Sequence, residues 1–384
     1  MSAPLEGVLV LDLSRVLAGP FCTMLLADLG ARVIKVESPS GGDVTRGWGP
    51  PDDPKTGISA YFLAVNRNKE SIALDLASPE GADAVRTIAR QCDVVVENFP
   101  PGGLEKFGLS LSAMRADNAG LVTASITGFG RRGPEASAPG FDLLAQAGSG
   151  LMTITGDPAG PASKSGVAIS DLFAGSFAAA GIAALLRSRE ATGQGGHVET
   201  DLLRSSFAAL VNVAQGCLMT GVEAGRHGNA HPQIVPYRTF AAEDGDIAVA
   251  VGTEPQFARL ARLVGHPEWI DDPRFTTNAD RVRHRAEIER PLEEIFRKGS
   301  RASWLSRLKS AGIPTGPVRG PLEALESEAA RAAGAIREAG GMRFVASPLT
   351  VEGAAAPLRL PPSLDQDGDR IRREFGLPAR PGRA

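Results

Sequence analysis

The segment that decides the fold is Gly7–Glu37, which reads GVLVLDLSRVLAGPFCTMLLADLGARVIKVE. Its first seven residues are almost continuously apolar, which is typical of a strand covered on both faces of a sheet. A helical pattern then opens at Gly19-Pro20 and runs to Leu29, and Gly30 is the residue type that commonly follows a helix. Residues 33–37 form a second apolar run. The segment therefore predicts a strand, a crossover helix and a parallel strand.

The same alternation continues along the first half of the chain. Residues 71–74 read as a strand, and Ser78-Pro79-Glu80 then opens a helix with a cap residue, a proline at the first position and an early acid. Two more apolar runs follow at 93–97 and 121–126. Strands and helices in this order predict an α/β fold with a large, doubly wound, Rossmann-like domain around a parallel sheet.

The middle of the chain contains a long apolar helical pattern, residues 171–189, which is polar only at its ends and is therefore expected in the interior. Its charge-free part, 172–186, is shorter than the ~20 residues that a bilayer requires. A strand at 197–200 and a helical pattern to about Thr220 follow, so the first part of the large domain is predicted as residues 1–220.

A second unit is expected beyond a change in composition. Residues 221–236 are rich in Gly, His and Pro and read as a linker. Residues 237–318 then combine a strand at 246–251 with polar, Arg-rich helices between 254 and 310, which predicts a smaller α+β domain. The last residues, 319–384, return to loops and short elements.

Composition and charge exclude several classes of protein. The 384 residues carry 41 Lys and Arg against 44 Asp and Glu, a net charge of −3, whereas proteins that bind nucleic acid or anionic membranes usually have a basic excess. Three widely spaced cysteines do not make a disulfide framework or a zinc site. The first residues contain no basic stretch followed by an apolar run. We therefore expect a cytoplasmic protein without nucleic-acid or membrane partners.

The usual cofactor motifs are also missing. No phosphate-binding Gly-x-x-x-x-Gly-Lys-Ser/Thr loop and no Gly-x-Ser-x-Gly element occurs, and the first strand is not followed by Gly-x-Gly-x-x-Gly. His227 and His231 are four residues apart, but in a Gly/Pro segment that does not favour a helix, so no metal site is expected. No tightly bound cofactor is predicted.

With these motifs missing, the remaining candidate for a reactive group is a carboxylate side chain. Asp171 follows Ser170 at the start of the apolar helix, and with Ser170 as the expected N-cap it lies in the first turn, where free N–H groups favour a negative charge. Acids are common at that position for structural reasons alone. A carboxylate held there can nevertheless attack an activated acyl group. The glycine-rich stretch 140–156 leaves room for such a substrate.

Along most of its length, the sequence resembles the class III coenzyme A transferase family of CaiB/BaiF type, which also includes the α-methylacyl-CoA racemases. Any one of the matching segments is weak, but the ordered set is specific, and it includes Leu26–Glu37, Gly42–Arg46, Asn66–Lys69, Val96–Phe99, Ser149–Met152, Ser170–Asp171, Thr192–Gly195 and Asp272–Phe275.

The resemblance implies an activity: CoA moves from an acyl-CoA donor to a carboxylic acid acceptor, with CoA thioesters as substrates. Asp171 matches the family's nucleophile, which forms an aspartyl anhydride and then an aspartyl-CoA thioester. The family's CoA contacts fall on Val16, Leu17, Ala18, Ser38, Leu74, Asp75, Asn98, Phe99, Lys106 and Phe107. Lys106 suits a CoA phosphate and Phe107 the adenine region.

Further features are expected from the same resemblance. The small domain is inserted into the large one, so that 319–384 complete the large domain, and two subunits form an interlaced homodimer. Four residues are candidates for contacting the acyl or acceptor group, namely Arg46, Asp142, His231 and Arg238. Two departures weaken family contacts, because Leu17 replaces a glutamine of the formyl-CoA transferases and Pro100 replaces a basic residue.

Two other functions stay open. An α-methylacyl-CoA racemase needs an acid or base on each face of its substrate, and the racemases place a histidine immediately before the residue that corresponds to Asp142. Here that position is Phe141, which cannot transfer a proton, so racemisation is disfavoured. A CoA-binding protein without turnover is the second alternative, and it would leave Asp171 unmodified.

Overall fold

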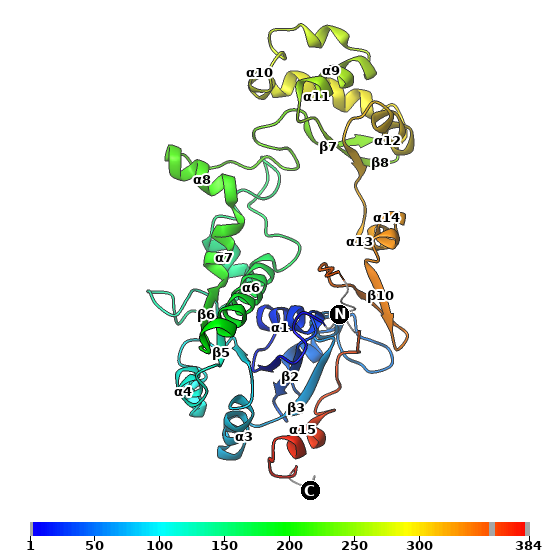
Figure 1. Cartoon of the computed structure of the whole chain (residues 1–384). Helices are drawn as coiled ribbons and strands as arrows, with labels where there is room; N and C mark the ends of the chain where they lie inside the picture. Colours follow the sequence, from blue (N-terminus) through cyan, green and yellow to red (C-terminus); the bar gives the residue numbers. More distant parts are fainter. Residues whose placement is uncertain (1–2, 353–357, 381–384) are drawn as a thin grey trace. The chain divides into compact units, whose positions relative to one another are not determined.

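The computed structural model describes residues 3–352 and 358–380 (Figure 1). Contacts divide the chain into two compact units. The first unit contains 1–151, 164–222 and 329–384, and the second contains 152–163 and 223–328. The expected linker 221–236 therefore belongs almost entirely to the second unit, which also takes in the short segment 152–163.

A six-stranded parallel sheet organises the first unit, in the order β3-β2-β1-β4-β5-β6. Its strands are β1 (Leu9–Asp12), β2 (Arg32–Glu37), β3 (Lys69–Ala73), β4 (Val94–Glu97), β5 (Val122–Thr127) and β6 (Gly196–Asp201). This order confirms the predicted α/β class with a doubly wound parallel sheet. The direction of winding reverses between β1 and β4, and ligands of such sheets bind where strands on the two sides of a reversal end.

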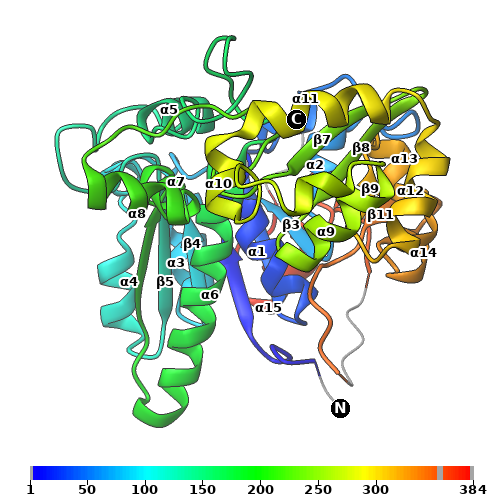
Figure 2. The same ribbon diagram turned by 90° about the horizontal axis from the view of Figure 1, so that it is seen from above.

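Helices cover both faces of this sheet (Figures 1 and 2). One apolar core lies under α3 (Pro79–Ala89), α4 (Leu111–Asp117) and α15 (Gly368–Glu374). The other lies under α1 (Ala18–Asp28) and α6 (Ile169–Thr192), which pack on each other. The remaining elements of this unit are η1 (Val44–Gly47), α2 (Ala60–Val65), η2 (Glu105–Phe107), α5 (Asp142–Gly148), α7 (Leu202–Ala209), α8 (Val211–Thr220), α14 (Glu328–Ala332) and the hairpin β10 (Ile336–Ala339) with β11 (Met342–Val345).

The long helix α6 differs from its prediction in two ways. Its N-cap residue is Ala168 rather than Ser170, and no side chain of its own caps it. Instead Asp142 Oδ1, from α5, accepts the Ser170 N–H at 2.9 Å, so a tertiary contact replaces the local cap. The helix is also buried along one face only, and Phe177 on it is exposed. By length and composition α6 is apolar enough to cross a membrane, but a core helix passes the same test.

The helical pattern that ends near Thr220 is broken at Leu210. The two helices α7 and α8 meet at 83° there, and Val211 has a positive φ of 43°. No residue of α8 is buried in the chain alone, although the helix is mainly apolar.

The second unit has an antiparallel sheet in the order β7-β8-β9, with helices over one apolar core. Its strands are β7 (Tyr237–Ala242), β8 (Gly245–Ala250) and β9 (Thr315–Pro317), and its helical elements are α9 (Glu254–Leu263), η3 (Pro267–Ile270), α10 (Asn278–Arg283), α11 (Arg285–Phe296), α12 (Arg301–Ser310) and α13 (Pro321–Leu325). These elements agree with an α+β unit.

Candidate active site

The loop between β1 and α1 is held from three sides at the carboxyl end of the sheet. Asn98, which follows β4, accepts the Arg15 N–H at 2.8 Å and donates to the Arg15 carbonyl at 2.6 Å. Lys35, on β2, donates to the Ser14 carbonyl at 2.9 Å. The Val16 N–H donates to Asp43 Oδ2 at 3.2 Å. The loop therefore has one conformation, set by the residues around it.

That conformation is strained at Val16, whose φ is 69°. A β-branched residue avoids this left-handed region, and strain of this kind is retained where surrounding structure enforces it, often at functional sites. Here the enforcing group is a buried ion pair, because Lys35 Nζ lies 3.0 Å from Asp43 Oδ2 and both side chains are inaccessible to solvent. Ala18, the first residue of α1, lies two residues after this strained position.

Asp171 lies against this loop. The Ala18 N–H donates a hydrogen bond to its carboxyl group. The approach depends on Gly175, one turn further along α6, since a Cβ built there would lie 2.5 Å from the Ala18 carbonyl oxygen. Only glycine allows α6 to come this close to α1. The small residue that the sequence places in this helix thus sets the position of the carboxylate.

The electrostatic surroundings of Asp171 disfavour its charge. Burial, and then the neighbouring carboxylate of Asp142, raise the pKa of Asp171 to about 7, against a single hydrogen bond from Ala18 that lowers it. Tyr61 lies in the same group, because burial and the charges of Asp171 and Asp142 raise its pKa to about 12. A carboxylate that is partly dehydrated, has few hydrogen bonds and ionises near neutral pH is suited to nucleophilic attack.

A cavity of about 210 Å³ opens at the ends of β1, β2 and β3. Five of the ten residues predicted to contact CoA line it, namely Ser38, Leu74, Asp75, Phe99 and Phe107. The rings of Phe99 and Phe107 meet edge to face at 5.9 Å, and the Arg15 guanidinium lies 4.7 Å from the centre of the Phe99 ring. An aromatic wall with a cation on it suits a flat, electron-rich ring next to a phosphate.

The other predicted CoA residues do not line this cavity. Val16, Leu17 and Ala18 form the strained loop and the start of α1, and Asn98 uses its amide to hold that loop. Lys106 is exposed on η2. Among the lining residues that the prediction missed are two cations, Arg15 and Lys35. Arg15 could have been predicted from the sequence, because it closely follows the first strand, where ligands of such sheets bind. Lys35 lies inside a strand, and its position in the sequence does not indicate a role in binding.

The predicted substrate residues are spread over both units. In the first unit, Asp142 is beside Asp171, as described above, but Arg46 is engaged with Glu37, its Nη2 lying 2.7 Å from Glu37 Oε1, and it also lies over the Phe62 ring. In the second unit, the Nδ1 atom of His231 accepts the Gln233 N–H at 3.0 Å.

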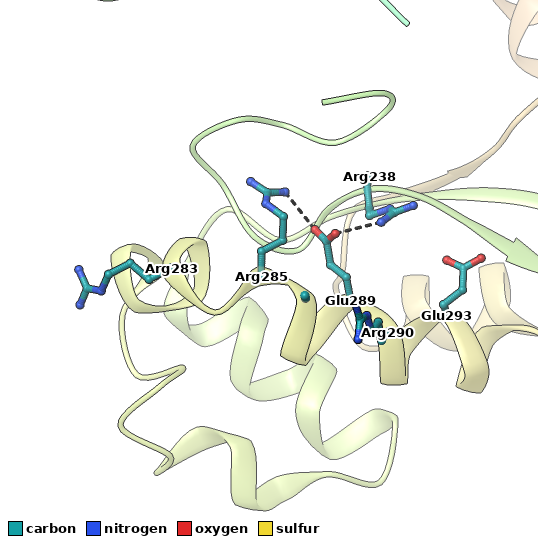
Figure 3. A pocket seen from close by; sticks show the side chains of 7 residues that line it. Arg238, Arg283, Arg285, Glu289, Arg290 and Glu293 are labelled. Carbon is teal, nitrogen blue, oxygen red and sulfur yellow. Dashed lines mark hydrogen bonds and ion pairs between the residues drawn. The ribbon is translucent and has the colours of Figure 1, made fainter. Parts of the chain in front are cut away.

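Arg238 lines a separate cavity of about 490 Å³ in the second unit, shown in Figure 3. Its Nη1 atom donates to Glu289 Oε2 at 2.9 Å, and Arg285 donates to the other oxygen of the same carboxylate at 3.0 Å. Both oxygens of Glu289 are therefore hydrogen-bonded, and neither Arg46 nor Arg238 is a free cation available to a substrate carboxylate.

Across the described ranges, no group of three or more His, Cys, Asp or Glu side chains could hold a metal ion.

Comparisons with known proteins identify the family. The family model for CoA-transferase family III matches residues 5–368. Succinyl-CoA:glutarate CoA-transferase of Mus musculus is 45% identical over 315 residues, which are 82% of this chain and 72% of that protein. Acetyl-CoA:oxalate CoA-transferase of Acetobacter aceti is 37% identical over 98% of this chain and 96% of its own length.

The solved structures extend the match to three dimensions. A CaiB/BaiF family protein from Brucella suis superposes with a TM-score of 0.89 at 39% identity, covering 98% of this chain and 100% of that one. The chain therefore belongs to CoA-transferase family III and is a CoA-transferase.

Proposed function

We propose that this protein moves CoA from an acyl-CoA donor to a carboxylic acid through two covalent states of Asp171. The carboxylate oxygen attacks the thioester carbon, the C–S bond breaks, and a mixed anhydride and CoA thiolate result. The thiolate then attacks the aspartyl carbonyl, which forms an aspartyl-CoA thioester and releases the donor's acid. The acceptor carboxylate repeats the sequence in reverse and leaves as the new acyl-CoA.

The observation that carries the proposal is the environment of Asp171. Its carboxyl group is partly buried, receives one backbone hydrogen bond and has its pKa raised to about 7. Fewer hydrogen bonds leave more of the lone-pair density available for attack, and exclusion of water protects an anhydride from hydrolysis. The ordinary role of a first-turn acid, completing a helix cap, is performed here by Asp142 instead.

The cavity beside the strained loop is proposed as the site of the CoA adenine end. Phe99 and Phe107 would contact the ring, Ser38, Leu74 and Asp75 line the rest, and Arg15 would face a phosphate. Exposed Lys106 remains a proposed phosphate contact. CoA enters as a substrate, and no tightly bound cofactor is part of the scheme.

We propose a short dicarboxylic acid as acceptor, with a succinyl-type donor. The support is similarity, because succinyl-CoA:glutarate CoA-transferases of mouse and human and a succinate–glutarate enzyme of Agrobacterium fabrum share 42–45% identity with this chain. All four proposed contacts already have partners within the chain. Arg46 and Arg238 are in ion pairs, both oxygens of Asp142 accept hydrogen bonds, and His231 Nδ1 accepts the Gln233 N–H, so each would have to exchange a partner for the substrate.

We also propose a homodimer in the cytoplasm, without nucleic-acid or membrane partners. The support is an apolar surface on α7 and α8 that the single chain leaves uncovered, where Leu218 is 81% and Met219 is 76% exposed. A second copy of the chain would cover it, since exposed apolar patches of this kind mark interaction surfaces. Sedimentation of wild type and of a Leu218→Glu variant tests the dimer.

The covalent step has a direct test. Wild type is mixed with succinyl-CoA, quenched with hydroxylamine and digested, and the peptide that contains Asp171 is weighed by mass spectrometry. We expect a hydroxamate at Asp171 in wild type and in an Asp369→Asn control, which changes an exposed acid on α15. If Asp171 stayed unmodified after succinyl-CoA is added, the proposed mechanism would be contradicted. A protein that binds CoA without turnover would then be favoured. Deuterium uptake at the α-carbon of a 2-methylacyl-CoA would instead indicate racemisation, despite the exposed Phe141.

A further inference from the structure

A second cavity in the first unit, of about 190 Å³, does not belong to the site described above. It lies where β4 ends, against α4 and the outer strand β6. Its polar lining consists mainly of Glu97, Glu105, Arg115, Arg131 and His197. None of these residues takes part in the proposed transfer reaction, so the cluster needs its own explanation.

Glu97 is the unusual member of this cluster. Its side chain is 2% exposed, and its Oε2 atom accepts the Phe99 N–H at 2.7 Å. Its Oε1 atom is buried and has no hydrogen-bond partner within the part of the chain that the structure describes. The nearest cation is Arg131, whose Nη1 atom is 3.6 Å away, too far for a hydrogen bond. A buried acceptor without a donor is costly, and the cavity is where a donor can be supplied.

Two arginines face the cavity together with Glu105 and His197. Arg115 donates through Nη1 to Thr123 Oγ1 at 2.6 Å, and among the described residues no carboxylate pairs with it. Arg131 reaches Glu105 at 3.3 Å and the Ser125 hydroxyl at 3.3 Å. His197 is held by Thr123, and burial together with the two arginines lowers its pKa, so it adds no charge at neutral pH.

A suitable ligand must therefore satisfy two demands at once. It must offer negative oxygens to the arginines and a proton to Glu97. Sulfate and simple carboxylate ions carry no proton at pH 8. A hydrogen phosphate group carries both charged oxygens and a P–OH donor, and arginines bind phosphate oxygens well. Burial raises the pKa of Glu97, against the Ser125 hydroxyl, the Phe99 N–H and Arg131, which lower it.

We propose that this cavity binds a proton-bearing phosphate group, with its P–OH donating to Glu97 Oε1 and its charged oxygens accepting from Arg115 and Arg131. The phosphate is either free inorganic phosphate, which keeps a P–OH at pH 8, or the phosphomonoester of a larger molecule, which keeps its P–OH only near or below its second pKa of about 6.

Titration calorimetry of the full-length protein at pH 8 tests this with inorganic phosphate and sulfate as probes. Because an ionised Glu97 accepts from phosphate and repels sulfate, we expect phosphate to bind ~10-fold or more tighter than sulfate. In Glu97→Gln the amide can donate to either anion, so sulfate binding should rise and the ratio should approach ~1. Equal binding of the two anions by wild type, or an unchanged ratio in Glu97→Gln, would overturn the proposal.

A second set of variants does not depend on the buried carboxyl. Arg115→Met should weaken phosphate binding by ~10-fold or more, whereas Arg132→Met, which removes an exposed arginine, should leave it unchanged. Circular dichroism confirms that each variant folds. Phosphate binding by Arg115→Met equal to that of wild type would contradict the proposal.

Competition at pH 6, where a phosphomonoester still carries a P–OH, identifies the source of the phosphate. If it is the 3′-phosphate of CoA, CoA displaces inorganic phosphate and 3′-dephospho-CoA does not. If neither displaces it, the ligand is phosphate itself or another monoester. Failure of the transferase assay would leave these binding results unaffected, so the two proposals can fail separately.

Discussion

Asp12 and Asp171, both in the first unit, show how neighbouring groups decide what a carboxylate does. Asp12, at the end of β1, is bound by Lys69 Nζ at 3.0 Å and by the Thr23 hydroxyl at 2.6 Å, and Ser14 donates to it through both its N–H and its hydroxyl. Although burial opposes ionisation, Lys69 and Lys35 outweigh it and lower the pKa of Asp12 to about 2. Asp171 has one hydrogen bond and a carboxylate for a neighbour, and its pKa is about 7.

The two pKa values differ because several donors and two lysines surround the carboxylate of Asp12, whereas Asp171 has few donors and a second carboxylate beside it. A carboxylate with a full set of donors is stable and unreactive, whereas one that lacks them is less stable in its charged form and a better nucleophile. Asp12 stabilises the carboxyl end of the central strand β1, and Asp171 performs the proposed chemistry. Variants of these aspartates and of the groups around Asp171 test whether this difference in donors explains their behaviour.

The largest effect is expected from Asp171→Asn. Loss of the nucleophile should lower kcat for CoA transfer by ~10³-fold or more, because the amide cannot form the anhydride. The folded-state pKa of Asp171 is raised, so its charge costs stability as the pH rises from about 4 to about 7, and the variant should be more stable than wild type by ~2 kcal/mol at pH 8. Steady-state kinetics and urea unfolding measure both. Transfer at the wild-type rate would remove Asp171 from the mechanism.

Asp12→Asn should have the opposite effect on stability. It removes the negative charge beside two buried lysines, and we expect a loss of ~3 kcal/mol at pH 7. Because the pKa of Asp12 is lowered, its contribution is present above pH 4 and is lost as the pH falls toward 2. The variant should therefore lose that part of the acid dependence of unfolding. The exposed Asp369→Asn serves as a control, and equal stability of the two variants would contradict the comparison.

Asp142→Asn should move the pH profile of the reaction. Wild-type kcat should rise with pH through about 7, as Asp171 ionises. Removal of the neighbouring charge lowers the pKa of Asp171, so this rise should shift ~0.5–1 pH unit toward acid. Asparagine can still accept the Ser170 N–H, which keeps the start of α6 in place. A profile that does not move would show that Asp142 has no electrostatic effect on the nucleophile.

The smallest effect is expected from Asn98→Ala. The side chain makes two hydrogen bonds to Arg15, and without them the loop that carries Val16 and Ala18 can relax from its strained form. We expect KM for the acyl-CoA to rise ~3–10-fold with a smaller change in kcat. Asn118→Ala, which removes hydrogen bonds to Arg90 and Cys92 elsewhere in the unit, should leave KM unchanged. If both variants had the same KM for the acyl-CoA, the conformation of this loop would not affect CoA binding.

Much of the fold could be predicted because its signals are local. The apolar runs of β1, β2, β4 and β5 and the capped start of α3 at Ser78 are written in adjacent residues, and the structure confirms them within two residues at each end. The N-cap of α6 could not be predicted in this way. Its backbone donor is satisfied by Asp142, 28 residues earlier, and no local pattern reports a partner that distant.

The sequence by itself determined the alternation of strands and helices, the family and the identity of the candidate nucleophile, because periodicity and ordered motifs depend on neighbouring residues. Only the tertiary structure decided the state of that nucleophile. A pKa depends on groups that folding brings together and on burial, here on Ala18 from α1, on Asp142 from α5 and on the partial burial of Asp171. The same holds for Asn98 and Arg46, since which groups their side chains already hold can be known only after the chain has folded.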